Sequence, residues 1–261
     1  MNHAQLIPTL KQLRLSGLAS TLEVRLQEAG SSRLSHIEFL SLLCQDEVNI
    51  RQQRQIAKRS RAAGFETPKT LEDFDWSFNA KIPKKQIYEL ATCRFIREAR
   101  CALFLGQPGL GKSHLAQAIG YEAIKQGYRV LRKSIFDLVH ELMTAESNGE
   151  KPGLLREYLK CDLLIIEDWA GKRLPVSSAE YLLEIVMRRY EKKSILLTSN
   201  RPLEDWGKLL QDVPVATAIL DRLLHHCDVI PFVGKSRRWP GAETLGLSWA
   251  NPESDSATAK S

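Results

Sequence analysis

The chain has 261 residues, 43% hydrophobic and 26% charged, which suffices for one large domain or for an ordinary domain with a small appendage. That balance excludes a wholly disordered chain, and no stretch approaches the ~20 uninterrupted apolar residues that a membrane helix requires. The formal net charge of +6 favours an acidic partner, although its distribution along the chain matters more than its total.

Two further features concern the cellular compartment. The N-terminus lacks the basic and then apolar segment of a secretory signal, so we expect a cytoplasmic protein without a membrane partner. The five cysteines are scattered and form no C-x-x-C pair. This spacing argues against a disulfide framework or a zinc site, and it predicts reduced, mostly buried thiols.

Residues 1–70 have the pattern of a small all-helical domain. Leucines recur at helical spacing over residues 6–13 and again over residues 18–26. Gly30 is the predicted stop of the second segment, because glycine favours helix ends.

A longer helix is predicted next. Ser35 and Glu38 have the spacing of a capping box, in which each side chain bonds the backbone N–H of the other residue. We expect this helix to continue to about Arg61, because Gly64 and Pro68 then interrupt the pattern. Residues 71–78 have the composition of an irregular connector with aromatic anchors.

Positive charge is concentrated in this helical region. Residues 1–70 hold ten Lys and Arg against six Asp and Glu, a net charge of +4, and residues 51–61 hold five basic residues and no acid. Most of these recur every three or four positions, so on a helix they form one cationic stripe. Such a stripe binds DNA by releasing condensed counterions, but a solvated helix face or a surface for an acidic protein has the same pattern. The candidate DNA contacts are Arg51, Arg54, Lys58, Arg59 and Arg61.

From about residue 80 the pattern changes to that of an α/β domain. A helix is expected over residues 87–97, and short, uniformly apolar segments then alternate with helical ones. Such segments are typical of parallel strands buried between helices, which predicts a three-layer α/β domain over residues 71–240. The predicted strands are residues 101–105, 129–131, 163–166, 194–198 and 229–232. Residues 241–261 are polar and are expected to form a disordered tail.

A phosphate-binding loop follows the first predicted strand. Three glycines of Gly-Gln-Pro-Gly-Leu-Gly-Lys-Ser let the backbone wrap around phosphate at the start of a helix, whose N–H groups and dipole attract anions. The lysine supplies a mobile cation for the β and γ phosphates, and the serine hydroxyl supplies a Mg²⁺ ligand. The position between a strand and a helix disfavours an accidental glycine turn, so we predict ATP and Mg²⁺ as cofactors. The expected nucleotide-binding residues are Gly106, Gln107, Pro108, Gly109, Leu110, Gly111, Lys112, Ser113 and His114.

The third predicted strand ends in two acids, as hydrolysis of a bound nucleotide requires. In such sites the first acid holds Mg²⁺ and the second polarises the attacking water, usually as Asp followed by Asp or Glu. Here the types are reversed, with Glu167 at the metal position, together with Ser113, and Asp168 as the predicted base. A merely solvated acid pair is the alternative. Asn200, after the fourth strand, is the candidate for a side chain between γ-phosphate and water, although Ser-Asn-Arg-Pro is also an ordinary turn.

A helical arginine precedes the last predicted strand. Arg222 is our candidate for an arginine finger that reaches the γ-phosphate of a neighbouring subunit, so that hydrolysis depends on assembly. The alternative is a surface ion pair with Asp221. His225 and His226 follow, and without a third ligand at metal spacing we interpret them as packing or backbone-bonding residues rather than a zinc site.

These elements, in this order and spacing, resemble the AAA+ ATPases, and within them the branch of the helicase loader DnaC and the initiator DnaA. A narrower resemblance is to the IstB family of transposition helper ATPases, which are encoded beside the transposase in certain insertion sequences. It covers roughly residues 5–238. It rests on an N-terminal Leu-Lys-Gln-Leu-Arg-Leu-Ser-Gly-Leu-Ala segment, the phosphate loop, the strand ends Glu-Asp-Trp and Leu-Thr-Ser-Asn, and the segment Asp-Arg-Leu-Leu-His-His.

The resemblance implies a homo-oligomer, promoted by ATP and DNA, that binds duplex DNA with little sequence preference, deforms it, and recruits or stimulates the cognate transposase. It also implies a five-stranded parallel sheet without the C-terminal helical lid of many relatives. Lys172 and Arg173, in the loop after the acid pair, are a second candidate DNA contact. The segment from Gly234 to Arg238 departs from the usual Gly-Glu-Ser-Tyr-Arg of the family, which leaves the roles of Arg237 and Arg238 open.

Two other functions share the predicted nucleotide site. A DnaC-like loader that acts on a replicative helicase has the same ATPase core, and a P-loop kinase for a small molecule binds the same phosphates. A kinase needs an acceptor pocket and usually a mobile lid, and the sequence suggests neither. Stimulation of ATP hydrolysis by duplex DNA is expected of an assembly helper and not of a kinase.

Overall fold

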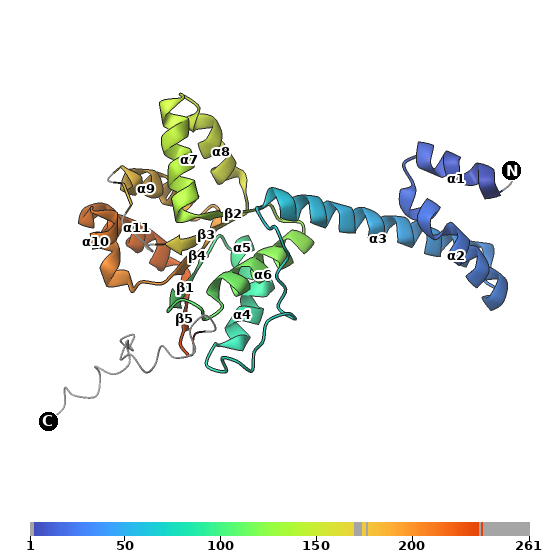
Figure 1. Cartoon of the computed structure of the whole chain (residues 1–261), viewed down its shortest axis with the longest axis horizontal. Helices are drawn as coiled ribbons and strands as arrows, with labels where there is room; N and C mark the ends of the chain where they lie inside the picture. Colours follow the sequence, from blue (N-terminus) through green and yellow to red (C-terminus); the bar gives the residue numbers. More distant parts are fainter. Residues whose placement is uncertain (1–2, 170–173, 176, 235, 237–261) are drawn as a thin grey trace. The chain divides into compact units, whose positions relative to one another are not determined.

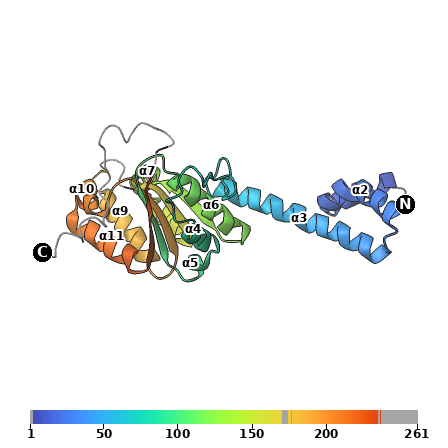
Figure 2. The ribbon, with the colours of Figure 1, turned by 90° about the horizontal axis from the view of Figure 1, so that it is seen from below.

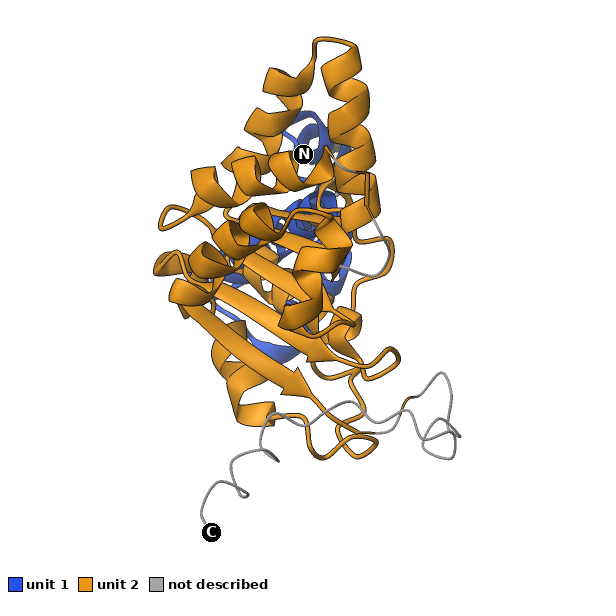
Figure 3. Ribbon diagram, turned by 90° about the vertical axis from the view of Figure 1, so that its left-hand side faces the viewer, with its two compact units in different colours: residues 1–59 blue, residues 60–261 orange. Residues whose placement is uncertain are grey.

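The chain divides into two compact units between Arg59 and Ser60 (Figure 3). The structure, a computed structural model, describes residues 3–169, 174–175, 177–234 and 236, so the predicted tail over residues 241–261 lies outside the described part. Within that part, every helix is too short or too polar to cross a lipid bilayer. The assignment of residues 1–70 to DNA or partner binding and of residues 71–240 to ATP hydrolysis stays a prediction.

The first unit contains α1 (His3–Gln12), α2 (Ser16–Ser32) and most of α3 (His36–Ala62). Its small core joins one leucine from each helix, Leu10, Leu22 and Leu43. The predicted stop at Gly30 is wrong, because α2 continues through it and ends where Arg33 adopts a left-handed φ of 50°. A glycine inside a helix costs only about 1 kcal/mol relative to alanine, which is too little to end the helix.

The predicted capping box at the start of α3 is confirmed. The backbone N–H of Ser35 donates to Glu38 Oε2 at 2.8 Å, and the N–H of Glu38 donates to Ser35 Oγ at 3.3 Å. The predicted end is confirmed as well, because Gly64 takes a left-handed φ of 82° just after the helix and donates its N–H to Arg61 O at 3.1 Å.

A five-stranded parallel sheet in the order β2-β3-β4-β1-β5 forms the centre of the second unit. All five predicted strands are present, each slightly shifted or extended, which confirms the predicted α/β fold class. Their bounds are β1 (Cys101–Gly106), β2 (Val130–Ser134), β3 (Leu163–Trp169), β4 (Ser194–Ser199) and β5 (Cys227–Phe232).

Helices cover both faces of this sheet, as the three-layer prediction requires (Figures 1 and 2). Helix α6 contacts β1, β2, β3 and β4 on one face together with α4, whereas α7, α9 and α11 pack on the other face around a large apolar core. The helix predicted over residues 87–97 is divided in two by Cys93, whose φ of 59° is left-handed. The helices of this unit after α3 are α4 (Lys84–Ala91), α5 (Arg94–Arg97), α6 (Lys112–Lys125), α7 (Ile135–Ser147), α8 (Lys151–Lys160), α9 (Ser178–Arg189), α10 (Trp206–Leu210) and α11 (Val213–His225), with a 3₁₀ turn η1 (Leu203–Asp205).

The five cysteines are free thiols, as predicted. Cys93 and Cys161 are buried, Cys101 and Cys227 are partly buried and Cys44 is exposed, so fewer of the thiols are fully buried than expected. Burial raises the pKa of the Cys93 thiol to about 11, which keeps it protonated and unreactive.

One buried arginine ties together the amino ends of two strands. The Arg189 side chain is fully buried, and its Nη1 donates to Tyr158 O at 2.6 Å and to Cys161 O at 3.0 Å. Its Nη2 donates to Ser194 O at 2.6 Å and to Asp162 O at 3.3 Å. These carbonyls belong to the end of α8, the segment that leads into β3 and the first residue of β4, so one guanidinium donates to backbone groups of three elements. Burial lowers the pKa of Arg189.

Replacing this guanidinium should destabilise the second unit. Arg189→Met removes the donors that the guanidinium supplies to these carbonyl oxygens, and we expect it to lower the free energy of unfolding by about 3 kcal/mol. Urea denaturation followed by circular dichroism measures the loss. Arg188→Met is the matched control, because Arg188 forms an exposed pair with Glu184 at 2.7 Å and should contribute less than about 1 kcal/mol. Equal losses in the two variants would contradict this account of Arg189.

Candidate functional site

Residues 106–113 connect the end of β1 to the start of α6, as predicted for a phosphate loop. Gly109 and Gly111 have left-handed φ values of 83° and 94°. The loop folds around its own lysine, since Lys112 Nζ donates to Gly106 O at 2.6 Å and to Gln107 O at 2.8 Å. Lys112 is therefore only 5% exposed, although its ammonium group is at the start of a helix where an anion would bind.

The last glycine of the loop is required by a neighbouring ring as well as by its backbone. A Cβ at Gly111 would lie 2.6 Å from Cε2 of Phe74, so any other residue would strain the backbone and displace this ring. Phe74 also packs edge-on against His114, with ring centroids 5.2 Å apart, and His114 Nε2 is hydrogen-bonded to Thr70 O at 2.9 Å. The His114 ring, predicted to bind nucleotide, is thus held by the connector.

This connector adds aromatic side chains beside the loop that the predicted site did not include. Trp76 contacts Phe74 at a centroid distance of 4.8 Å and stacks on Tyr88 at 5.7 Å, with Lys84 Nζ 5.1 Å from the centre of the Trp76 ring. In the sequence, the aromatic residues of segment 71–78 were the signal that could have indicated these contacts. Only the fold brings it against α6.

The first acid of the pair is buried and already paired. Glu167 is 5% exposed and accepts a forked pair of hydrogen bonds from Arg132, from Nε to Oε1 at 2.8 Å and from Nη2 to Oε2 at 2.9 Å. Gln117 Nε2 lies 3.4 Å from Glu167 Oε1. Sequence reasoning missed Arg132, because nothing in a single strand indicates which residue of the neighbouring strand faces it.

The second acid lies in a different environment. Asp168 is exposed and has a left-handed φ of 56°, at an irregularity in the pairing of β3 with β4 between Ile166 and Trp169. Its N–H donates to Thr198 Oγ1 at 3.2 Å. A left-handed aspartate inside a bulged strand is the kind of strained geometry that concentrates at functional sites.

Asn200 is hydrogen-bonded to this second acid. Its Nδ2 donates to Asp168 Oδ1 at 3.3 Å, so the structure brings together two residues that the sequence analysis had assigned to one site. They come from the ends of β3 and β4, which are adjacent in the sheet.

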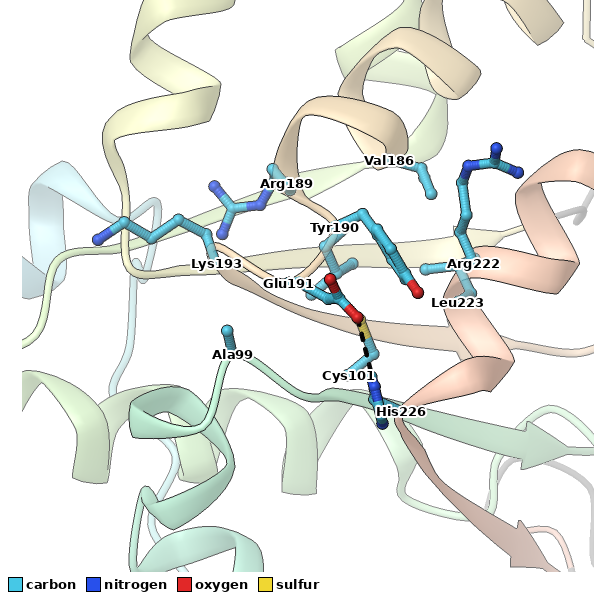
Figure 4. A pocket seen from close by; sticks show the side chains of 11 residues that line it. Ala99, Cys101, Val186, Arg189, Tyr190, Glu191, Lys193, Arg222, Leu223 and His226 are labelled. Atoms are coloured by element: carbon cyan, nitrogen blue, oxygen red, sulfur yellow. Dashed lines mark ion pairs between the residues drawn. The ribbon is translucent and has the colours of Figure 1, made fainter.

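Arg222 lies at the opposite end of the sheet from the phosphate loop of its own chain. It lines a pocket with Cys101 and Ile195, at the starts of β1 and β4 (Figure 4). At 3.3 Å per residue, the five steps from Cys101 to Gly106 put roughly 16 Å between this pocket and the loop. The Arg222 guanidinium donates to Ala218 O at 3.1 Å and is 3.7 Å from the exposed Asp221 carboxylate.

The two histidines after Arg222 have a third possible ligand nearby. Glu191 Oε1 lies 3.5 Å from His226 Nε2 and 4.0 Å from His225 Nδ1, and one ligand atom from each residue falls within 4.8 Å of the others. The premise that no third ligand approaches them is therefore wrong, because the turn between α9 and β4 brings Glu191 to the end of α11. All three are exposed, and Tyr190 Oη is 2.6 Å from His225 Nδ1.

The basic residues of α3 fall into two groups, and the first is engaged within its own unit. Arg51 bonds Glu47 Oε1 at 2.6 Å and donates to Arg14 O at 3.0 Å. Arg54 donates to Ser16 Oγ. These two arginines fasten α3 to the α1–α2 segment, so the predicted stripe is not a uniformly free cationic face.

The second group, Lys58, Arg59 and Arg61, is free of ion pairs within the described part of the chain. Lys58 and Arg61 are exposed, and Arg59 is half-buried. The second candidate DNA contact, Lys172 and Arg173, lies outside the described residues, as do Arg237 and Arg238.

The fold and the loop define a class of protein. Parallel strands in the order β2-β3-β4-β1-β5, with a phosphate loop after β1, characterise a P-loop nucleotide-binding domain of the AAA+ type. The replication initiator DnaA bound to AMPPCP and single-stranded DNA matches with a TM-score of 0.54 and 24% identity, over 66% of this chain and 52% of that one. DnaI matches with a TM-score of 0.52 and 22% identity, over 65% of this chain and 90% of that one. At these identities the likeness concerns the fold alone.

Sequence comparison identifies the family. The family model of IstB-like ATP binding proteins matches residues 8–242. An ATP-binding protein of insertion sequence IS5376 from Geobacillus stearothermophilus is 37% identical over 227 residues, 87% of this chain and 90% of the relative. Its counterpart of IS21 from Pseudomonas aeruginosa is 36% identical over 254 residues, 97% of this chain and 96% of the relative. The chain therefore belongs to the family of IstB-like ATP-binding proteins.

Proposed function

We propose that this cytoplasmic protein is a Mg²⁺-dependent ATPase of an insertion sequence, which oligomerises on duplex DNA and recruits or stimulates the transposase. The observation that carries the ATPase part is the contact between Asp168, near the end of β3, and Asn200, directly after β4, which is the neighbour of β1. The insertion-sequence proteins that share 36–37% identity with this chain support the biological setting.

Nucleotide binding would use the loop as it stands. The Lys112 ammonium donates to two carbonyl oxygens of its own loop. Phosphate oxygens would replace these acceptors, because a charged acceptor forms a stronger hydrogen bond with the ammonium. The unpaired N–H groups at the start of α6 add further donors for the same anion. Binding therefore requires an exchange of partners at Lys112 rather than a rebuilt loop.

The residues at this edge of the sheet fit a Mg²⁺ ion. Gln117 of α6 is hydrogen-bonded to the Glu167 carboxylate, and Ser113 lies one helical turn before Gln117. Ser113 is therefore on the side of α6 that faces Glu167. A hydroxyl and a carboxylate are the hard oxygen donors that Mg²⁺ prefers, and the ion would neutralise phosphate charge there.

The attacking water would be activated by Asp168. Its carboxylate is exposed, so Oδ2 is open to accept a proton from water while Oδ1 accepts the hydrogen bond from Asn200. Asn200 therefore orients the base. Thr198 fixes the same residue through its backbone, so the bulge holds Asp168 in one conformation.

Asp168→Asn should separate binding from hydrolysis. Asparagine keeps the shape and tolerates the left-handed backbone, but it cannot take up a proton. We expect unchanged ATP affinity and hydrolysis at least about 100-fold slower, the usual contribution of a general base. Steady-state phosphate release and equilibrium binding of a fluorescent ATP analogue measure the two quantities, with Glu157→Gln on the exposed surface of α8 as control. Loss of binding instead would assign Asp168 to the metal.

Family membership and the open basic residues of α3 support the DNA part of the proposal. Lys58 and Arg61 are exposed and lie three residues apart on one helix, so both can face a phosphate backbone. A replicative helicase loader is the alternative from the sequence. DnaI shares only the fold at 22% identity, whereas the insertion-sequence proteins share 36–37% identity over most of the chain, and the proposal follows the latter.

The DNA proposal is tested by hydrolysis and by salt dependence. Duplex DNA should stimulate ATP hydrolysis by the wild-type protein. In Lys58→Glu/Arg61→Glu, two phosphate contacts are lost, so the slope of log K against log salt should fall by about two. Lys11→Glu/Lys160→Glu changes the net charge equally on other exposed positions and should keep the slope. If duplex DNA did not stimulate ATP hydrolysis by the wild-type protein, the proposal would be wrong, and a kinase or a helicase loader would be the remaining functions.

The position of Arg222 supports hydrolysis between subunits. Arg222 lines a pocket at the start of β1, and the length of that strand, roughly 16 Å, separates the pocket from the loop of the same chain. An arginine finger supplied by a neighbouring subunit would stabilise the transition-state charge. A nucleotide held between the loop of one subunit and Arg222 of the next would join the two subunits, so ATP would promote assembly.

Mixing two inactive variants tests this arrangement. Lys112→Ala lacks a working loop and Arg222→Ala lacks a finger, so each alone should hydrolyse ATP at background rates. A mixture should recover part of the activity, because one interface then joins an intact Lys112 to an intact Arg222. Mixing Lys112→Ala with the Lys112→Ala/Arg222→Ala double variant is the control and should recover none. If no mixing ratio restores hydrolysis, the finger assignment is wrong.

A further inference from the structure

Three side chains with metal-binding groups lie close together where α9 and α11 end. Glu191 is in the turn between α9 and β4, His225 is the last residue of α11, and His226 precedes β5. One carboxylate oxygen and one ring nitrogen from each histidine all lie within 4.8 Å of one another. The cluster is separate from the nucleotide site, because it lies beside the start of β1 and the phosphate loop follows the end of that strand.

The spacing of these atoms suits a shared cation better than direct hydrogen bonds. Glu191 Oε1 lies 3.5 Å from His226 Nε2 and 4.0 Å from His225 Nδ1. Hydrogen bonds between nitrogen and oxygen are shorter, usually about 2.7–3.2 Å. A tetrahedral zinc ion, with bonds of about 2.0–2.1 Å, keeps its ligand atoms about 3.3 Å apart. Because all three side chains are exposed, rotation about their side-chain bonds would bring the atoms to that spacing.

The backbone holds two of these residues in place. The carbonyl oxygen of His226 accepts a hydrogen bond from the Cys101 N–H at 2.8 Å, which fixes His226 to the start of β1. Glu191 has a left-handed φ of 56°, in a turn that the next two residues close with N–H bonds to Arg189 O, both at 2.9 Å. A site whose backbone positions the ligands beforehand loses less conformational entropy when an ion binds.

The surroundings of the cluster leave room for an added positive charge. Arg222 and Lys193 line the same pocket, but their side chains point away from the pair of Glu191 and His226 (Figure 4). Lys193 is neutralised by Asp162, at 2.5 Å. The cluster also lies at the C-terminal end of α11, where the last carbonyl groups of the helix attract cations.

The histidines are arranged as neutral rings would be. Their ring centroids are 4.0 Å apart, so two protonated rings would repel each other strongly. Tyr190 Oη is 2.6 Å from His225 Nδ1, and a hydroxyl that donates to this nitrogen uses its lone pair. The same lone pair binds a metal, so an ion at His225 would replace a neutral hydrogen-bond donor.

We propose that Glu191, His225 and His226 bind a divalent transition metal ion of the zinc type, which joins the α9–β4 turn to the end of α11. Imidazole nitrogens favour such ions over Mg²⁺ and Ca²⁺, which prefer oxygen ligands. Three protein ligands leave a fourth position for water on the solvent side. Arg222 lies one helical turn before His225, so the bound ion restrains the segment that carries this arginine. Neither ATP nor DNA takes part in the binding.

Direct measurement of zinc affinity tests the site. Untagged protein without nucleotide is titrated with Zn²⁺ against a chromophoric chelator, in excess Mg²⁺ that occupies sites made of oxygen ligands alone. Glu191→Gln and His226→Gln each remove a ligand, so each should weaken Zn²⁺ binding at least about tenfold, since even partners outside the coordination sphere contribute that much. His36→Gln, at the exposed start of α3, is the matched control and should bind as wild type does. Equal affinities in all four proteins, or no binding by wild type, would overturn the proposal.

Cobalt distinguishes these ligands from the free thiols of the chain. Co²⁺ held by two imidazoles and a carboxylate should absorb weakly in the visible range, without the intense near-ultraviolet charge-transfer band of a cobalt thiolate. Cys44 is an exposed thiol, so Cys44→Ser should leave Co²⁺ binding unchanged. A charge-transfer band, or loss of binding in Cys44→Ser, would place the ion on a thiol and contradict the proposal.

Hydrogen exchange in the wild-type protein tests whether the ion joins the two segments. Zn²⁺ should slow amide exchange at Lys192 and Lys193, because the ion restrains the turn that their N–H groups close. It should also raise Tm as its concentration rises. Neither effect should appear in Glu191→Gln, and both should appear in His36→Gln. If wild type binds Zn²⁺ but exchange slows at neither amide, the ion does not join the segments and the proposal is wrong.

Discussion

The nucleotide site depends on one constraint, which is that β1 runs parallel to both of its neighbours in the middle of the sheet. Its last residues pair with Ser199 of β4 and Phe232 of β5, so the loop after β1 emerges beside the ends of other strands. Parallel strands end at a common edge, and that edge receives the loop, the acid pair and Asn200 together. The buried guanidinium of Arg189 secures the opposite edge, where the strands begin. The loop, the acid pair and Asn200 thus lie along one rim because the strand directions agree.

Environment rather than residue type distinguishes the two acids at this rim. Glu167 is buried and paired to Arg132, whereas Asp168 is exposed on a left-handed bulge and bonded to Asn200. Adjacent carboxylates in such different surroundings suit different tasks, as in the proposed roles of metal ligand and proton acceptor. The reversed order of Glu and Asp is accommodated in this way. The longer side chain spans to the next strand, and the shorter one is presented by the bulge.

Much of this arrangement was predictable from local pattern. Short apolar segments predicted all five strands, because a strand buried on both faces has no polar alternation, and the capping box of Ser35 and Glu38 predicted the start of α3. The failures were also physical. Gly30 did not end α2, since its cost in a helix is small, and Cys93 broke a helix without any glycine or proline to indicate it. The linkage of Glu191 to the histidine pair required two turns distant in sequence to meet.

The sequence by itself determined the phosphate loop, the acids that follow the third strand, Asn200 and the class of fold, because each depends on residue types at short, regular spacing. Only the tertiary structure decided what those side chains face. Arg132 and Phe74 carry no motif, and their contacts with Glu167 and Gly111 arise from strand register and from a connector folding back over α6. Likewise, whether a basic residue of α3 is open or engaged depends on the helices packed beside it. Partners distant in the chain are set by three-dimensional packing, which local periodicity does not encode.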